Sequence, residues 1–72
     1  MDIRKRFGKK IRNARSSRGW SQEDLAGASG LDRTYISGIE RGVRNPTITV
    51  VDQFAKALGV DAGALLAEET EE

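Results

Sequence analysis

The sequence predicts an all-α, compact domain of five short helices, and three observations lead to that class. Residues that favour helix N-termini recur along the chain, and most of them begin a segment that is followed by a glycine. Within those segments the apolar residues lie three or four positions apart. The one β-branched cluster, residues 47–51, follows a proline and has no second strand to pair with. We expect one domain over residues 1–67 and a frayed acidic tail over residues 68–72.

The first helix is expected to begin after Asp2, a favourable N-cap residue, and to end before Gly19. Its apolar residues have the spacing of a single helix face, which predicts that this face is buried in a core. They are Ile3, Phe7, Ile11 and Ala14.

A second helix is expected to begin after Ser21 and to end near Gly30. Asp24 lies three residues after Ser21, so the two side chains can form a capping box. Trp20 precedes the cap and can pack on Leu25 in the next turn, which predicts that Trp20 lies in the core.

Three further helices follow. Asp32 is the expected N-cap of a helix over residues 33–41. A fourth helix is expected over about residues 49–58, where the apolar spacing is again helical. Asp61 is the expected N-cap of a short fifth helix over residues 62–67.

Charge is divided along the chain, although the total is close to zero. The sequence has 12 Lys and Arg against 11 Asp and Glu, a net charge of +1. Residues 1–44 hold 11 of the basic residues and 5 acidic ones, whereas residues 45–72 hold only Lys56 against 6 acidic residues. Such asymmetry between the halves of a chain points to contact with nucleic acid or a membrane.

The composition excludes several classes of function. Without cysteine the chain has no disulfide or thiolate site, which suits a cytoplasmic location, and without histidine it cannot form a Ser-His-Asp triad. No apolar run approaches the roughly 18–20 residues of a membrane span. The acidic residues are scattered, and no glycine-rich phosphate loop is present. We therefore expect no enzyme, cofactor, metal site, membrane partner or small-molecule effector.

Residues 22–41 have the spacing of a helix-turn-helix. With Gln22 as position 1, Ala26 at position 5 is small enough for two helices to approach, and Gly30 at position 9 suits the turn between them. This geometry lets the second helix enter the major groove of DNA. Apolar residues at positions 4, 10, 15 and 18 hold the pair together: Leu25, Leu31, Ile36 and Ile39.

The first turns of the helix over residues 33–41, the second of the helix-turn-helix, carry the candidate base contacts. Arg33 is long enough to reach both acceptors of a guanine, and a cation at a helix N-terminus opposes the helix dipole, so a purely solvated role explains it poorly. Thr34 and Ser37 lie on the exposed face and are expected to contact bases. Tyr35 is expected to contact the DNA backbone, with partial burial as the alternative.

The string SQEDLAGASGLDRTYISGIERGVRNPT, followed by AKALGV, resembles the phage-repressor and Cro-like helix-turn-helix (XRE) family, whose fold is lambda-repressor-like. The resemblance covers roughly residues 4–66. Within that family, LDRTYISGIERGVRN is particularly similar to the controller proteins of restriction–modification systems, which are small homodimeric transcription regulators with palindromic operators. Gly27 and Ser29 depart from the pattern, where a helix former and a small apolar residue are usual.

The resemblance implies further contacts with DNA. Gln22 matches the family position that meets a phosphate and braces the recognition helix. The loop after that helix is expected to contact the DNA backbone through Arg41 and Asn45 and the bases through Arg44.

The resemblance also implies one structural contact, a salt bridge between Arg15 of the first helix and Glu40 of the third. The homodimer surface is a separate expectation, because Val60, Leu65 and Leu66 would otherwise be exposed on a domain with a thin core.

Together these observations predict a sequence-specific transcription regulator that binds double-stranded DNA as a homodimer on a pseudo-palindromic operator. Three alternatives remain open at this point: a phage or chromosomal repressor, an antitoxin, and a protein-interaction module that has lost DNA binding.

Overall fold

The computed structural model describes residues 2–68, which form five helices and no strand, as the sequence predicts. The expected acidic tail lies outside the described residues from residue 69 onward. Within residues 2–68, no helix has the length and apolar character needed to cross a membrane. The helices are α1 (Ile3–Ser17), α2 (Gln22–Ser29), α3 (Arg33–Arg41), α4 (Ile48–Leu58) and α5 (Ala62–Leu66).

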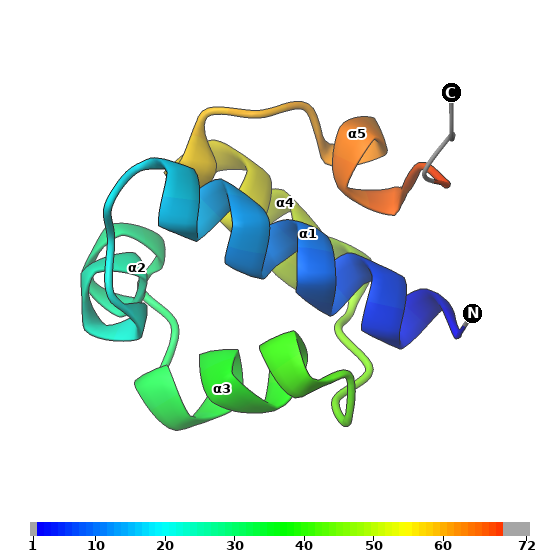
Figure 1. Ribbon diagram of the computed structural model, residues 1–72, viewed down its shortest axis with the longest axis horizontal. Helices are drawn as coiled ribbons and strands as arrows, with labels where there is room; N and C mark the ends of the chain where they lie inside the picture. Colours follow the sequence, from blue (N-terminus) through cyan, green and yellow to red (C-terminus); the bar gives the residue numbers. More distant parts are fainter. Residues whose placement is uncertain (1, 69–72) are drawn as a thin grey trace.

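Helix α1 runs through the middle of the molecule and contacts α3, α4 and α5 (Figure 1). Helix α2 lies beside the C-terminal end of α1 and contacts α3 and α4. Helix α3 forms the lower edge of the view in Figure 1, whereas α5 lies on the opposite side of α1. As a result α3 has an inner face against α1 and α2 and an outer face that no other helix covers.

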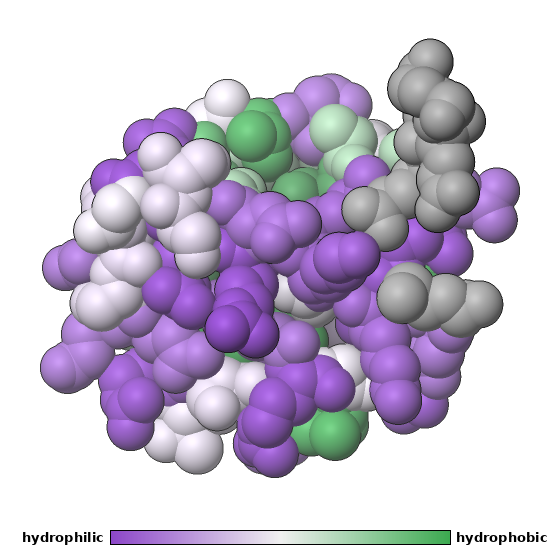
Figure 2. All heavy atoms as spheres, in the orientation of Figure 1, coloured by the Kyte–Doolittle hydropathy of each residue, from purple (hydrophilic) through white to green (hydrophobic). Residues whose placement is uncertain are grey.

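All five helices contribute to one apolar core. The rings of Phe7 and Phe54 meet edge to face inside it, with their centroids 5.8 Å apart. The surface seen in Figure 2 is mostly hydrophilic, with apolar areas at its upper and lower edges. Within residues 2–68 the buried apolar side chains are Phe7, Ile11, Leu25, Ile36, Ile39, Val51, Phe54, Ala55, Leu58 and Leu65.

The predicted N-caps of the first two helices are confirmed. The Asp2 carboxylate accepts a hydrogen bond of 2.8 Å from the backbone N–H of Arg4. In α2 the Ser21 hydroxyl accepts from the N–H of Asp24 at 3.0 Å, and the Asp24 carboxylate accepts from the N–H of Ser21 at 2.8 Å. These bonds satisfy N–H groups that have no partner within a helix, so they fix where each helix begins.

The last two helices depart from their predicted bounds. Helix α4 begins at Ile48 because the Thr47 hydroxyl accepts from the N–H of Val50 at 3.2 Å and so acts as the N-cap. Helix α5 ends at Leu66, one residue earlier than expected. Asp61 is the N-cap residue of α5, as predicted, but its carboxylate makes no capping hydrogen bond. One carboxylate oxygen lies 2.9 Å from where a Cβ of Gly63 would stand.

The backbones of α1 and α3 touch at Gly8. A Cβ added there would lie 2.1 Å from the carbonyl oxygen of Ile39 and 3.0 Å from that of Glu40. Real carbon and oxygen atoms do not approach so closely, so only glycine permits this crossing. The apolar spacing of α1 did not predict the role of Gly8.

Arg18 links the junction between α1 and α2 to the end of α4. Its Nε donates to the carbonyl oxygen of Leu58 at 3.1 Å, and a terminal nitrogen donates to the same oxygen. The guanidinium also lies 5.0 Å from the centroid of the Trp20 ring. The expectation that Trp20 belongs to the core was therefore wrong: it is half-buried, packs against the core and has Arg18 over its ring.

Candidate nucleic-acid interface

The predicted helix-turn-helix is formed by α2, a short turn and α3. Helix α2 ends at Ser29 and is capped by Gly30, which has a φ of 77° and donates its N–H to the carbonyl of Ala26 at 2.9 Å. A φ in this left-handed region is easily adopted only by glycine. The Ser29 hydroxyl then accepts from the N–H of Leu31 at 3.2 Å, which holds the turn closed. The chain therefore reverses at the position that the motif requires.

Asp32 organises the first turn of α3. One of its carboxylate oxygens accepts from the N–H of Thr34 at 2.9 Å and from the N–H of Tyr35 at 3.3 Å, which confirms it as the N-cap. Arg33 and Thr34 are exposed. The Asp32 carboxylate thus satisfies backbone N–H groups of this turn, while the side chains of Arg33 and Thr34 face solvent.

Gln22, the first residue of α2, joins the two ends of α3 through its side-chain amide. Its Nε2 donates to Glu40 in the last turn of α3 at 3.1 Å. Its Oε1 accepts from Nη1 of Arg33 in the first turn at 3.4 Å, a long hydrogen bond. One amide therefore sets the position of α2 against α3 and restrains the exposed Arg33 side chain.

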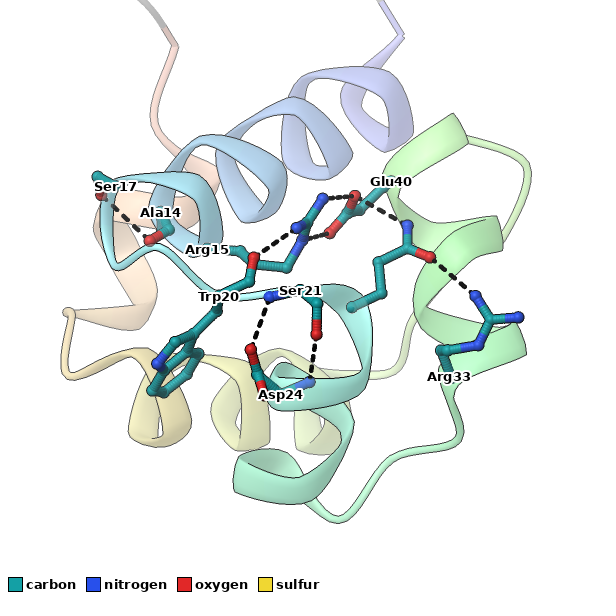
Figure 3. Close-up of polar contacts among 9 residues, drawn as sticks. Ala14, Arg15, Ser17, Trp20, Ser21, Asp24, Arg33 and Glu40 are labelled. Atoms are coloured by element: carbon teal, nitrogen blue, oxygen red, sulfur yellow. Dashed lines mark hydrogen bonds and ion pairs between the residues drawn. The ribbon is translucent and has the colours of Figure 1, made fainter.

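The Arg15–Glu40 ion pair anchors this arrangement to α1 (Figure 3). Nε and Nη2 of Arg15 donate to the two Glu40 oxygens at 2.7 and 3.0 Å, and Nη1 donates to the carbonyl oxygen of Trp20 at 2.7 Å. The side chains are only 14% and 5% exposed. The hydrogen bond that Arg15 donates to Glu40 raises the pKa of Arg15 despite partial burial, which favours the charged guanidinium. The expected bridge between α1 and α3 is present.

The loop after α3 returns along the helix. Val43 donates its N–H to the carbonyl of Gly38 at 3.0 Å, and the exposed Arg44 then lies over Tyr35, with its guanidinium carbon 5.7 Å from the ring centroid. Tyr35 is half-buried and packs against the core, which was the alternative reading of that residue. The structure therefore brings Arg44 beside α3, 11 residues after Arg33 in the sequence.

The remaining candidates differ in how far they are exposed. Ser37 is half-buried on α3, and Arg41 is exposed in its last turn, where a cation favours the helix dipole. Asn45 is exposed but borders a hollow with Ile3 and Phe7 of α1.

The predicted dimer residues separate into two groups. Leu65 is 3% exposed and belongs to the core, so the expectation that it would be exposed was wrong. Val60 and Leu66 are 38% and 41% exposed. Ile48 was not predicted, although it is 88% exposed and lines a hollow between α4 and α5 together with Leu66. Val60 does not line that hollow.

The clustered groups are hydrogen-bond donors suited to binding. Arginine, threonine and glutamine side chains offer hydrogen bonds to acceptors such as phosphate oxygens and base edges. Within residues 2–68, no set of three or more acidic, histidine or cysteine side chains is placed to hold a metal ion.

The chain matches the helix-turn-helix family over residues 11–65. It is similar to control protein C.BamHI of Bacillus amyloliquefaciens, at 48% identity over 66 residues that cover 90% of this chain and 82% of that protein. It is also similar to a hypothetical transcription factor of Neisseria meningitidis serogroup B, at 45% identity over 65 residues. That match covers 90% of this chain and spans 61% of the Neisseria protein.

Two solved structures of controller proteins have the same fold. C.AhdI of Aeromonas hydrophila superposes with a TM-score of 0.83 at 42% identity, over 86% of this chain and 94% of its own. C.Esp1396I, solved as a tetramer in complex with its natural 35 base-pair operator, gives a TM-score of 0.82 at 42% identity, over 90% of this chain and 86% of its own. The chain therefore belongs to the XRE-type helix-turn-helix family of DNA-binding transcription regulators.

Proposed function

We propose that the chain regulates transcription by laying the outer face of α3 in the major groove of a specific operator. The observation that carries this proposal is the grouping of Arg33, Thr34 and Ser37 on α3 with Arg44 from the following loop. Side chains of these types make most contacts with base edges and phosphates in the major groove. Arg33, Thr34, Ser37 and Arg44 are assigned to bases.

Residues around this group are proposed to contact the phosphates of the DNA backbone. Gln22 stands at the N-terminus of α2, where backbone N–H groups and the helix dipole favour an anion. Tyr35, Arg41 and Asn45 are assigned to the DNA backbone. Because several of the contacts are made by cations that displace counterions, binding should weaken steeply as the salt concentration rises.

We further propose that two copies associate through the hollow between α4 and α5. Ile48 and Leu66 are exposed apolar residues on its rim, with Val51 and Ala62 also lining it. Burying them against a second copy removes apolar surface from water. Helix α5, which forms part of this surface, lies on the opposite side of α1 from α3 (Figure 1). A second copy bound there would therefore leave α3 free to contact DNA. Such a dimer would require half-sites about 34 Å apart, or a multiple of it, in a pseudo-palindromic operator.

The controller of a restriction–modification system is the specific role we propose. It rests on the similarity to C.BamHI and C.AhdI, over most of the chain in both cases. The tetramer of C.Esp1396I on its operator supports the further proposal that two dimers of this chain assemble on one operator.

Selection of binding sites from a pool of random double-stranded DNA tests the proposal. The selected sites should be pseudo-palindromic, and Arg33→Ala should weaken binding by about 1–3 kcal/mol and relax the preference at one base pair of each half-site. Arg12→Ala is the matched control, because Arg12 is exposed on α1, outside the proposed base-reading group. It should leave the base preference of the selected sites unchanged. Failure to select any site would favour the protein-interaction module.

A further inference from the structure

The side chain of Arg44 lies along α3 in a shallow path over Gly38, which is open because residue 38 has no side chain. A Cβ added to Gly38 would lie 2.8 Å from Cγ of Arg44, 3.2 Å from its Nε and 3.5 Å from its Cδ. These three atoms are the nearest neighbours of that Cβ outside the helix itself. The aliphatic part of Arg44 therefore lies directly on the backbone of α3 at Gly38.

Gly38 is not needed for the backbone conformation. It lies inside α3 and does not have a positive φ, so any residue could adopt its conformation. Glycine inside a helix costs about 1 kcal/mol relative to alanine. The chain thus carries a residue that weakens α3, and the nearest group that gains room from it is the Arg44 side chain.

Beyond Gly38 the Arg44 side chain reaches the ring of Tyr35. Tyr35 and Gly38 are three residues apart and share one face of α3. The Arg44 guanidinium carbon lies 5.7 Å from the ring centroid, a cation–π contact. Within the described part of the chain, the guanidinium has no hydrogen-bond or ion-pair partner, so its donors remain available to a ligand.

We propose that Gly38 is a positioning residue for operator recognition: its missing side chain lets Arg44 lie along α3, with its guanidinium held by Tyr35 beside the base-contacting turns. This inference rests on the proposed function and deepens it, since it assigns how a loop arginine is fixed before DNA arrives. An arginine that is already ordered loses less conformational entropy on binding than a free one.

The Gly38→Ala variant separates positioning from folding. The clashing atoms belong to a flexible side chain that can swing away, and alanine is the better helix former, so the melting temperature should stay the same or rise. Gly27→Ala is the matched control, because Gly27 is also inside a helix but a Cβ there would meet nothing within 4 Å. A clearly lower melting temperature for Gly38→Ala would overturn the proposal.

The first readout is made without DNA. In the wild-type protein the Tyr35 ring should shift the side-chain Hγ and Hδ NMR signals of Arg44 upfield. Gly38→Ala should remove that shift, as should Tyr35→Leu, whereas Gly27→Ala should keep it. Unchanged Arg44 signals in Gly38→Ala would overturn the proposal whether or not the protein binds DNA.

The second readout is affinity for the selected operator. Arg44→Ala should weaken binding by about 5- to 150-fold, the range for loss of one bidentate base contact, and Gly38→Ala by about fivefold or more. In the Arg44→Ala background, Gly38→Ala should have no further effect. If wild type binds and Gly38→Ala binds equally well, or if its effect persists without Arg44, positioning by Gly38 is overturned while the proposed function stands. If wild type selects no DNA, both fail.

Discussion

Glu40 meets Arg15 through two parallel hydrogen bonds, of 2.7 and 3.0 Å, and accepts a third from Gln22 at 3.1 Å. This carboxylate is therefore the point where α1, α2 and α3 are joined by polar contacts. A bidentate pair of this kind fixes orientation as well as distance. The position of the recognition surface relative to the core depends on it.

Loss of either partner should destabilise the fold severely. We expect Arg15→Ala and Glu40→Ala each to lower the free energy of unfolding by about 3–5 kcal/mol, because each leaves a largely buried charge without its partner. Urea denaturation measures this. The double variant should lose less than the sum of the single losses, and two changes near zero would contradict a structural role for the pair.

Gly8→Ala should also destabilise the protein, for a steric reason. The added methyl would meet the backbone of α3, which cannot move aside as a side chain can, so we expect a loss of about 1–3 kcal/mol. Gly27→Ala, with open space around it, should instead raise stability by about 0.5–1 kcal/mol. Thermal melting compares the two variants, and a Gly8→Ala protein as stable as wild type would exclude a close crossing of α1 and α3.

Asp2 should titrate at unusually low pH. Hydrogen bonds from the side chain of Arg4 and then from its backbone N–H lower the pKa of Asp2 from 3.8 to about 2. A lowered pKa means that the capping contribution is complete above about pH 4 and is lost as the pH falls toward 2. An NMR titration of the Asp2 carboxyl carbon measures this directly. Arg4→Ala should bring the midpoint back toward 3.8, and an ordinary midpoint in wild type would contradict the contact.

Leu66→Glu should disrupt the proposed dimer. A charge placed on the rim of the hollow between α4 and α5 would have to be buried in the interface. The dissociation constant of the dimer should therefore rise by about tenfold or more. Ile48→Glu should act in the same way. Val43→Glu is the control, because Val43 is also exposed and apolar but does not line the hollow. Analytical ultracentrifugation measures the equilibrium, and equal effects of all three variants would reject this surface.

The sequence predicted those parts of the fold that depend on neighbouring residues. The capping box of Ser21 and Asp24, the cap at Asp32 and the turn at Gly30 each involve groups within a few residues of one another. Their geometry follows from local bonding rules, so a single sequence is enough to place them. The exposure of Arg33 follows from its position directly after the cap.

Features created by the meeting of distant segments could not be predicted in this way. The roles of Gly8 and Gly38 depend on what lies opposite them, namely the α3 backbone and the Arg44 side chain. In a helix as short as α5, two adjacent leucines give no periodicity to show which one faces the core, and the structure buries Leu65 rather than Leu66. Spacing alone does not contain that information.

If Arg44 contacts bases as proposed, its path along α3 has a consequence for transferring the DNA preference of this protein to another scaffold. A graft of the helix alone, Arg33–Arg41, would leave Arg44 behind. A graft of residues 33–44 would carry it, but only a host with glycine at the equivalent of position 38 and an aromatic ring at the equivalent of position 35 would receive it in the same place. The portable unit is therefore a helix together with its return loop, and an exchange of surface residues on the helix alone would transfer an incomplete preference.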